Sequence, residues 1–166
     1  MSDELTAPEF ELSRLLERLG GERVEFVVIG GIARIALGSP RFTKDLDICP
    51  ALDRPNLKRL ARALNSLNPK LRSEDEPVPV KLNAALLERT QVMTLETDAG
   101  WIDILHEPKG SGGYDALRRH AERIELDGYP VIVAAIDDQI AMKLASGRQL
   151  DLGDVEILRA IKRLGG

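Results

Sequence analysis

In this sequence, two aspartates separated by one residue have the type and spacing that suit the binding of metal ions. Asp45 and Asp47 lie in the segment Asp45-Leu46-Asp47-Ile48, in which acidic and apolar residues alternate. Residues two apart in a β-strand share a face, so both carboxylates point the same way while Leu46 and Ile48 point into the core. Two convergent carboxylates can bridge a pair of hard cations such as Mg²⁺. The alternative is a solvated strand end that carries two exposed acids.

A pair of glycines precedes these acids. The apolar run 26–29 predicts a strand buried on both faces, and Gly30-Gly31 allows a tight turn into a helix over 31–37. Backbone N–H groups at the start of a helix bind anions well. A phosphate-binding turn followed by two carboxylates is what a metal–nucleotide site requires. The glycines also fit a plain turn between packed elements, and both interpretations can hold together.

A third acid follows later in the chain. Asp103 is the only charged residue in the apolar segment 101–105, which predicts a strand. Burying an ionised carboxylate there is costly unless a cation or hydrogen bonds compensate it. We therefore expect Asp103 to complete a metal site with Asp45 and Asp47. The alternative is an edge strand whose aspartate faces water.

These motifs resemble those of a known superfamily. Gly30-Gly31, thirteen intervening residues and Asp45-Leu46-Asp47-Ile48 are similar to the signature of the polymerase-β-like minimal nucleotidyltransferases. Residues 136–143, Gly147-Arg148 and 151–155 are similar to a second block in the abortive-infection and toxin–antitoxin branch of that superfamily. The resemblance covers about residues 24–160. Family members often carry serine where this chain has Gly31, which removes one hydroxyl contact.

The resemblance implies a transfer of NMP from an NTP to an acceptor hydroxyl, with Mg²⁺ in a two-metal site. Asp103 matches the third acid of the family and would position or help to deprotonate the acceptor. Lys143 would contact phosphate, as would Arg34, Thr43 and their neighbours Arg41 and Lys44, although each is also compatible with a plain surface role. Arg148 would pair with Asp151 or Asp154, which is a structural role. The acceptor implied is RNA, such as tRNA, or a protein, and the chain would be the toxin paired with a cognate antitoxin.

Composition limits the partners. The chain has 166 residues, a net charge of −4 and one cysteine. No global positive field attracts RNA, so only local basic groups could contact it; the candidates are Lys58, Arg59, Arg62, Arg118 and Arg119, which solvated helix faces explain equally well. The acidic N-terminus, the short apolar runs and the single Cys49 lead us to expect a cytoplasmic protein that does not span a membrane. Cys49, His106 and His120 match no catalytic motif. A non-catalytic binding module and a small-molecule nucleotidyltransferase stay open as alternatives.

The pattern of elements predicts an α+β fold with a small mixed sheet and a helical C-terminal end. We expect one domain over 1–166, with a core over about 22–136 and C-terminal helices over about 137–166. The remaining predictions are helices over 8–19, 54–67, 81–89, 114–123, 136–146 and 152–164, a strand over 23–29, a strand over 45–49, and hairpins over 92–105 and 124–136. Residues 68–79 are interpreted as a loop, either a flexible flap or a solvated connector.

Overall fold

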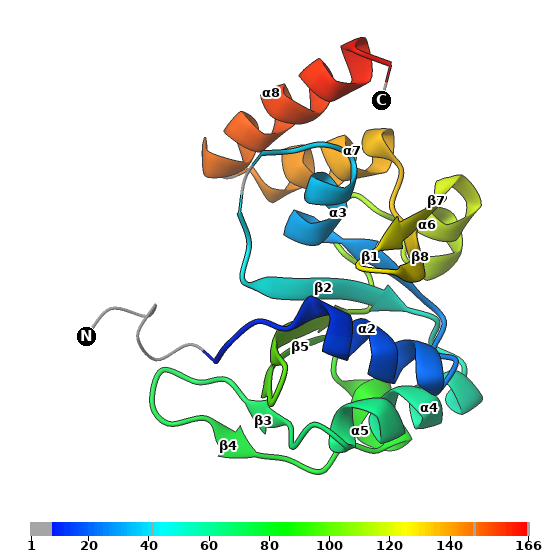
Figure 1. Ribbon diagram of the computed structural model, residues 1–166, viewed down its shortest axis with the longest axis vertical. Coiled ribbons are helices and arrows are strands. Elements are labelled where there is room, and N and C mark those ends of the chain that lie inside the picture. Colours follow the sequence, from blue (N-terminus) through cyan, green and yellow to red (C-terminus); the bar gives the residue numbers. More distant parts are fainter. Residues whose placement is uncertain (1–7, 41, 148, 166) are drawn as a thin grey trace.

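The computed structural model describes residues 8–40, 42–147 and 149–165 (Figure 1). The described helices are α2 (Leu12–Gly21), α3 (Gly30–Ala36), α4 (Arg54–Asn65), α5 (Ala84–Arg89), α6 (Tyr114–His120), α7 (Ile136–Ser146) and α8 (Gln149–Arg163). The strands are β1 (Phe26–Ile29), β2 (Asp45–Pro50), β3 (Lys70–Leu71), β4 (Val78–Pro79), β5 (Val92–Thr97), β6 (Gly100–Leu105), β7 (Glu122–Leu126) and β8 (Tyr129–Val133). The predicted α+β class is therefore confirmed.

The strands form one eight-stranded mixed sheet in the order β4-β3-β5-β6-β2-β1-β8-β7. Most neighbours are antiparallel, but β2 runs parallel to β6 and β1 runs parallel to β8. The β5–β6 and β7–β8 hairpins were predicted from their turn residues, and both are present. The parallel pairing of β2 with β6 is the feature that matters for the site, because it joins two segments distant in the chain.

Both faces of the sheet bury apolar side chains. One core contains leucines of α2 and α4 together with Leu46, Ile48 and Ile104 of the central strands. A smaller core on the opposite face contains Val27, Ile29 and Cys49, against Leu117 of α6 and Met142 of α7. The alternation along β2 follows from its period of two: Leu46 and Ile48 are fully buried in the first core, and Asp45 and Asp47 face the other way. Over the described residues, no helix has the length and apolar character needed to cross a membrane.

Several predicted boundaries differ from the structure. Helix α2 begins at Leu12 rather than at residue 8, because the N–H of Glu11 donates to the carbonyl of Ala99 and holds the preceding segment extended along the β5–β6 turn. Helix α6 ends at His120, and β7 already begins at Glu122. Helix α8 begins at Gln149, three residues earlier than predicted. The start of α2 thus depends on a tertiary contact, which local sequence patterns do not contain.

The segment 68–79 was predicted to be a loop, and this was wrong in part. It contains the two short strands β3 and β4, which pair with each other and extend the sheet beyond β5. Figure 1 shows this hairpin projecting from the body of the molecule. We refer to residues 70–79 as the β3–β4 hairpin.

Candidate functional site

The glycine turn between β1 and α3 is shaped by the acids opposite it. Gly30 has φ +69°, a conformation that side chains rarely adopt, and a Cβ there would overlap the Asp47 carboxylate. A Cβ on Gly31 would lie 2.8 Å from the Thr43 hydroxyl oxygen. The predicted tight turn is therefore present, and both glycines also make room for side chains of the site. The Thr43 hydroxyl fills the space that a serine side chain at position 31 would need.

The three predicted acids lie together. Asp47 pairs in register with Asp103, and Asp45 with Trp101, because β2 and β6 run side by side in parallel. One carboxylate oxygen from each of Asp45, Asp47 and Asp103 lies within 4.8 Å of the other two. Thr43, predicted to bind nucleotide, donates a hydrogen bond from its hydroxyl to Asp45 Oδ1 at 2.9 Å. Its hydroxyl therefore orients one of the three acids.

Burial and mutual repulsion make this cluster unfavourable without a cation. Burial raises the pKa of Asp47 to about 8, with further contributions from the charges of Asp45 and Asp103. Burial also raises the pKa of Asp103. The second oxygen of Asp47, Oδ1, is buried and has no hydrogen-bond partner among the described residues. Three hard oxygen donors with an unsatisfied buried atom fit a divalent cation such as Mg²⁺.

A second group of charges lies on the other side of the glycine turn. The Asp154 carboxylate on α8 is almost fully buried, and its Oδ2 lies 3.6 Å from Arg34 on α3 and 3.5 Å from Lys143 on α7. Arg34 and Lys143 line a cavity of about 190 Å³ together with Gly30 and the apolar side chain of Met142. The two predicted phosphate contacts thus converge beside the glycine turn, and a buried carboxylate links them.

The predicted pairing of Arg148 with an acid lies outside the described residues, and so does the side chain of Asp151. Asp154, the other predicted partner, contacts Arg34 and Lys143. Arg41 also lies outside the described residues. Lys44 is part-buried immediately before β2.

Arg72 is a site residue that the sequence analysis missed. It follows β3 in the hairpin, and its guanidinium lies 3.2 Å from Asp103 Oδ1 and 4.3 Å from the centre of the Trp101 ring. This arginine opposes the rise in the pKa of Asp103. The signal in the sequence was a basic residue beside an acidic run, Ser73-Glu74-Asp75-Glu76, in a segment without strong periodicity. Nothing in that local pattern indicates contact with a residue on β6.

Cys49, His106 and His120 have structural surroundings. The Cys49 thiol is buried and donates to the carbonyl of His106 at 3.4 Å, and burial raises its pKa to about 12. His106 Nε2 lies 2.7 Å from the carbonyl of Leu87. His120 is exposed and lies 3.4 Å from Asp138. A thiol with so high a pKa is a poor nucleophile, and Cys49 lies in the smaller core.

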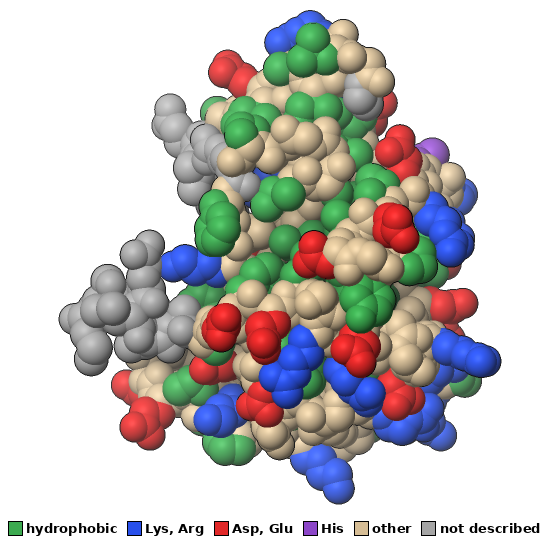
Figure 2. Space-filling view, viewed as in Figure 1, with side chains coloured by type: hydrophobic (Ala, Val, Ile, Leu, Met, Phe, Trp, Pro, Cys, Tyr) green, Lys and Arg blue, Asp and Glu red, His purple; other side chains and the backbone are tan. Residues whose placement is uncertain are grey.

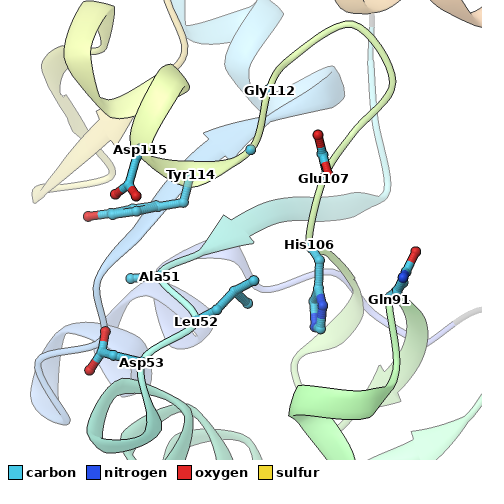
Figure 3. A pocket seen from close by; sticks show the side chains of 10 residues that line it. Ala51, Leu52, Asp53, Gln91, His106, Glu107, Gly112, Tyr114 and Asp115 are labelled. Carbon is cyan, nitrogen blue, oxygen red and sulfur yellow. The ribbon is translucent and has the colours of Figure 1, made fainter.

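A cavity of about 580 Å³ lies beyond the far end of β2 (Figure 3). It is bounded by Ala51 and Leu52 after the strand, by His106 and Glu107 after β6, and by Tyr114 at the start of α6. None of the three acids lines it. It is about three times the volume of the cavity at the glycine turn, but the convergent carboxylates lie elsewhere, so we place the candidate site at the acids.

The predicted basic groups do not form one surface. Lys58, Arg59 and Arg62 lie on α4, which packs on one face of the sheet, whereas Arg118 and Arg119 lie on α6, which packs on the other. Arg62 pairs with Glu22 at 3.1 Å, and Arg59 donates to the carbonyl of Arg23. Figure 2 shows acidic and basic side chains intermixed over the part of the visible face where α2 and α4 lie. These basic residues are better explained as solvated helix faces.

Comparison with known proteins extends the description of the fold. No protein-family model matches the chain, and no curated protein matches it. Among solved structures, the lincosamide antibiotic adenylyltransferase LnuA, solved with lincomycin bound, superposes with a TM-score of 0.61 at 16% identity over 92% of this chain and 99% of that one. The antibiotic-resistance factor ANT(2'')-Ia gives a TM-score of 0.59 at 15% identity over 93% and 82%. An antigenic nucleotidyltransferase-like protein from Paracoccidioides brasiliensis gives 0.54 at 17% identity over 90% and 77%.

The chain therefore has the fold seen in nucleotidyltransferases. This is the fold that the sequence resemblance implies. The abortive-infection and toxin–antitoxin branch is not supported by these matches.

Proposed function

We propose that this protein is a metal-dependent nucleotidyltransferase that transfers NMP from an NTP to a hydroxyl group of an acceptor. The observation that carries the proposal is the convergence of the carboxylates of Asp45, Asp47 and Asp103 within 4.8 Å, directly opposite a glycine turn that has no room for a side chain. The fold shared with nucleotidyltransferases supports it.

The three acids would hold Mg²⁺, which would neutralise phosphate charge and activate the acceptor oxygen when bound. In the overall reaction the acceptor oxygen forms a bond to the α-phosphorus, the bond to the β-phosphate bridge oxygen breaks, and pyrophosphate leaves. Asp103 is our candidate for orienting the acceptor hydroxyl and taking its proton. Catalysis of this kind depends mainly on alignment and on charge stabilisation.

The remaining predicted residues would bind the nucleotide. The backbone N–H groups at Gly30 and Gly31 would contact the triphosphate, and Arg34 and Lys143 would balance its charge from the adjoining cavity. Thr43 would act by holding Asp45 in place. Each of these roles is a proposal that the geometry supports.

The acceptor divides the proposal into two candidates. RNA or a protein is the acceptor that the sequence resemblance implies, with a toxin role and an antitoxin partner. A small molecule is the second candidate, and it is supported by the intermixed surface charges, the net charge of −4 and the likeness to an adenylyltransferase solved with a bound antibiotic. The acidic run Glu74-Asp75-Glu76 of the β3–β4 hairpin would also repel a polyanionic RNA.

Transfer of radiolabel tests the proposal. The protein would be incubated with Mg²⁺ and each α-³²P-labelled NTP, with total RNA and protein extract in one set and a panel of hydroxylated small molecules in another. We expect wild-type protein to label one acceptor class, and the double variant Asp45→Asn/Asp47→Asn to lose at least about 10³-fold in rate, because the proposed ligands are removed.

Asp127→Asn is the matched control. Asp127 is an exposed residue of the β7–β8 turn with φ +49°, a conformation that asparagine tolerates well, and it should retain full activity. Equal labelling by the double variant and the wild type would refute the site. Absence of labelling with every NTP and acceptor, together with no effect of Mg²⁺–NTP on thermal stability, would favour a non-catalytic binding module.

A further inference from the structure

The β3–β4 hairpin is attached to the sheet by few contacts. Its strands have two residues each, and its backbone is fixed to β5 by the pairing of Lys70 and Leu71 and by the bond from the Arg72 N–H to the Thr94 carbonyl at 3.1 Å. The side chains of Leu71 and Val78 are exposed. A segment with little buried apolar surface opens at a small cost in free energy, so a single side-chain contact has a large effect on its docking.

Arg72 makes that contact, and it does so with a proposed metal ligand. Its guanidinium is half-buried between the Trp101 ring and the Asp103 carboxylate. An arginine stays charged at any pH a protein tolerates, so this is a permanent positive charge at the third acid. A divalent cation at the same carboxylate would lie close to this charge and be repelled by it.

We propose that Arg72 is a positioning residue that serves as a built-in counter-cation for Asp103, so that divalent-cation binding and docking of the β3–β4 hairpin oppose each other. The inference rests on the proposed metal site. In the metal-free protein Arg72 compensates the charge of the third acid and holds the hairpin against the sheet. When a cation binds the Asp103 carboxylate, the ion pair between Arg72 and Asp103 weakens and the hairpin is released from the sheet. The coupling is reciprocal, because each event changes the free energy of the other by the same amount.

Binding of Mn²⁺ alone to the metal-free protein tests the sign of this effect. Isothermal titration calorimetry without nucleotide would compare wild type with Arg72→Gln and Arg72→Lys. We expect Arg72→Gln to bind Mn²⁺ about three- to tenfold more tightly, since a competing charge is removed. Arg72→Lys keeps the charge and should stay within about twofold of wild type. If Arg72 instead held the Asp103 carboxylate in the position that binds metal, Arg72→Gln would bind Mn²⁺ more weakly. That result would overturn the proposal.

Arg54→Gln is the matched control for net charge. Arg54 is exposed at the start of α4 and pairs with Glu88 at 3.0 Å, so this variant loses the same charge away from the acids. Its Mn²⁺ affinity should equal that of wild type. An increase as large as that of Arg72→Gln would mean that overall charge, and not Arg72, sets the affinity, and this would also overturn the proposal.

Hydrogen exchange measures the other side of the coupling. Saturating Mn²⁺ should speed exchange several-fold at the amides of residues 70–72 and of Val80, which bonds to the Pro69 carbonyl, and leave the amides of β6 unchanged. In Arg72→Gln these hairpin amides should exchange fast with or without Mn²⁺. Unchanged hairpin exchange in wild-type protein would contradict the coupling.

The outcomes separate this inference from the proposed function. Mn²⁺ binding that is lost in Asp45→Asn/Asp47→Asn but unaffected by Arg72→Gln would leave the metal site standing and refute the role of Arg72. Failure of wild-type protein to bind Mn²⁺ at all would refute both.

Discussion

Gly30 and Asp47 constrain each other at the scale of single residues. The acid occupies the space that a side chain at position 30 would take, and the glycine has a backbone conformation that few other residues adopt. A tight turn at Gly30 and backbone N–H groups that bind an anion were predicted from the sequence. The steric contact with Asp47 was not, because it depends on how β1 lies beside β2. The glycine therefore fixes where the carboxylate lies.

Substitution of Gly30 should harm both stability and the site. Gly30→Ala would strain the backbone by about 1–2 kcal/mol and push the Asp47 carboxylate out of the cluster. We expect a lower free energy of unfolding in urea and a weaker affinity for Mn²⁺. Gly20→Ala is the control, because no atom lies within 4 Å of a Cβ there and alanine favours the helix. A Gly30→Ala protein as stable as wild type and equal in Mn²⁺ affinity would contradict the steric account.

At the scale of elements, the sequence predicted the types of the elements better than their partners. The alternation in β2 and the Asp127-Gly128 turn of the β7–β8 hairpin are local patterns, and the structure confirms both. The pairing of β2 with β6 brings together residues that are far apart in the chain, and local patterns do not reveal it. Asp103 was therefore grouped with Asp45 and Asp47 only from the chemistry of a buried carboxylate and from the family resemblance. The two-residue strands of the β3–β4 hairpin are too short to give a periodic signal, and Arg72 was missed with them.

The C-terminal helix α8 contributes a buried carboxylate to two other helices. Asp154→Asn keeps the size of the side chain but removes the charge that faces Arg34 and Lys143. The two part-buried cations would then lose the negative charge that faces them both, so we expect the free energy of unfolding to fall by about 2 kcal/mol. Urea denaturation measures it, and Glu156→Gln, at an exposed position on the same helix, should have no effect. An Asp154→Asn protein with wild-type stability would show that the three charges do not depend on one another.

At the scale of the whole molecule, the raised pKa of Asp47 connects stability to pH. In the metal-free folded protein Asp47 keeps its proton up to about pH 8, whereas in the unfolded chain it loses it near its ordinary value of 3.8. Between these values the folded state binds more protons than the unfolded state. The contribution of Asp47 to the free energy of unfolding therefore falls as pH rises from about 4 to 8 and is constant above.

A comparison with Asp47→Asn in EDTA isolates that contribution. The variant has no proton to lose, so its stability advantage over wild type should grow between pH 5 and pH 8 and then level off. Saturating Mg²⁺ should reverse the advantage, because wild-type protein then gains the binding free energy. Thermal melts at each pH measure the difference. A difference independent of pH in EDTA would mean that Asp47 is ionised in the folded protein at all these values.

The fold of the whole molecule is shared with proteins of very different sequence. The likeness to the three solved structures described above, at 15–17% identity, extends over most of the chain and establishes the architecture. The acceptor depends on surface residues, which differ most between proteins that share a fold. The prediction of one domain over 1–166 stays a prediction. The labelling experiment addresses the acceptor directly.

The strict alternation of buried and site-facing side chains on β2 and β6 has a consequence for how the chain folds. A slip of one residue between these strands would turn a whole set of side chains to the wrong face. Asp103 would then enter the leucine-rich core, and Ile102 or Ile104 would take its place beside Asp47. Misaligned chains would be too unstable to accumulate. A molecule that completes its core in the register Asp47–Asp103 has also assembled its three acids, so a one-residue slip cannot yield a folded protein with a disordered site.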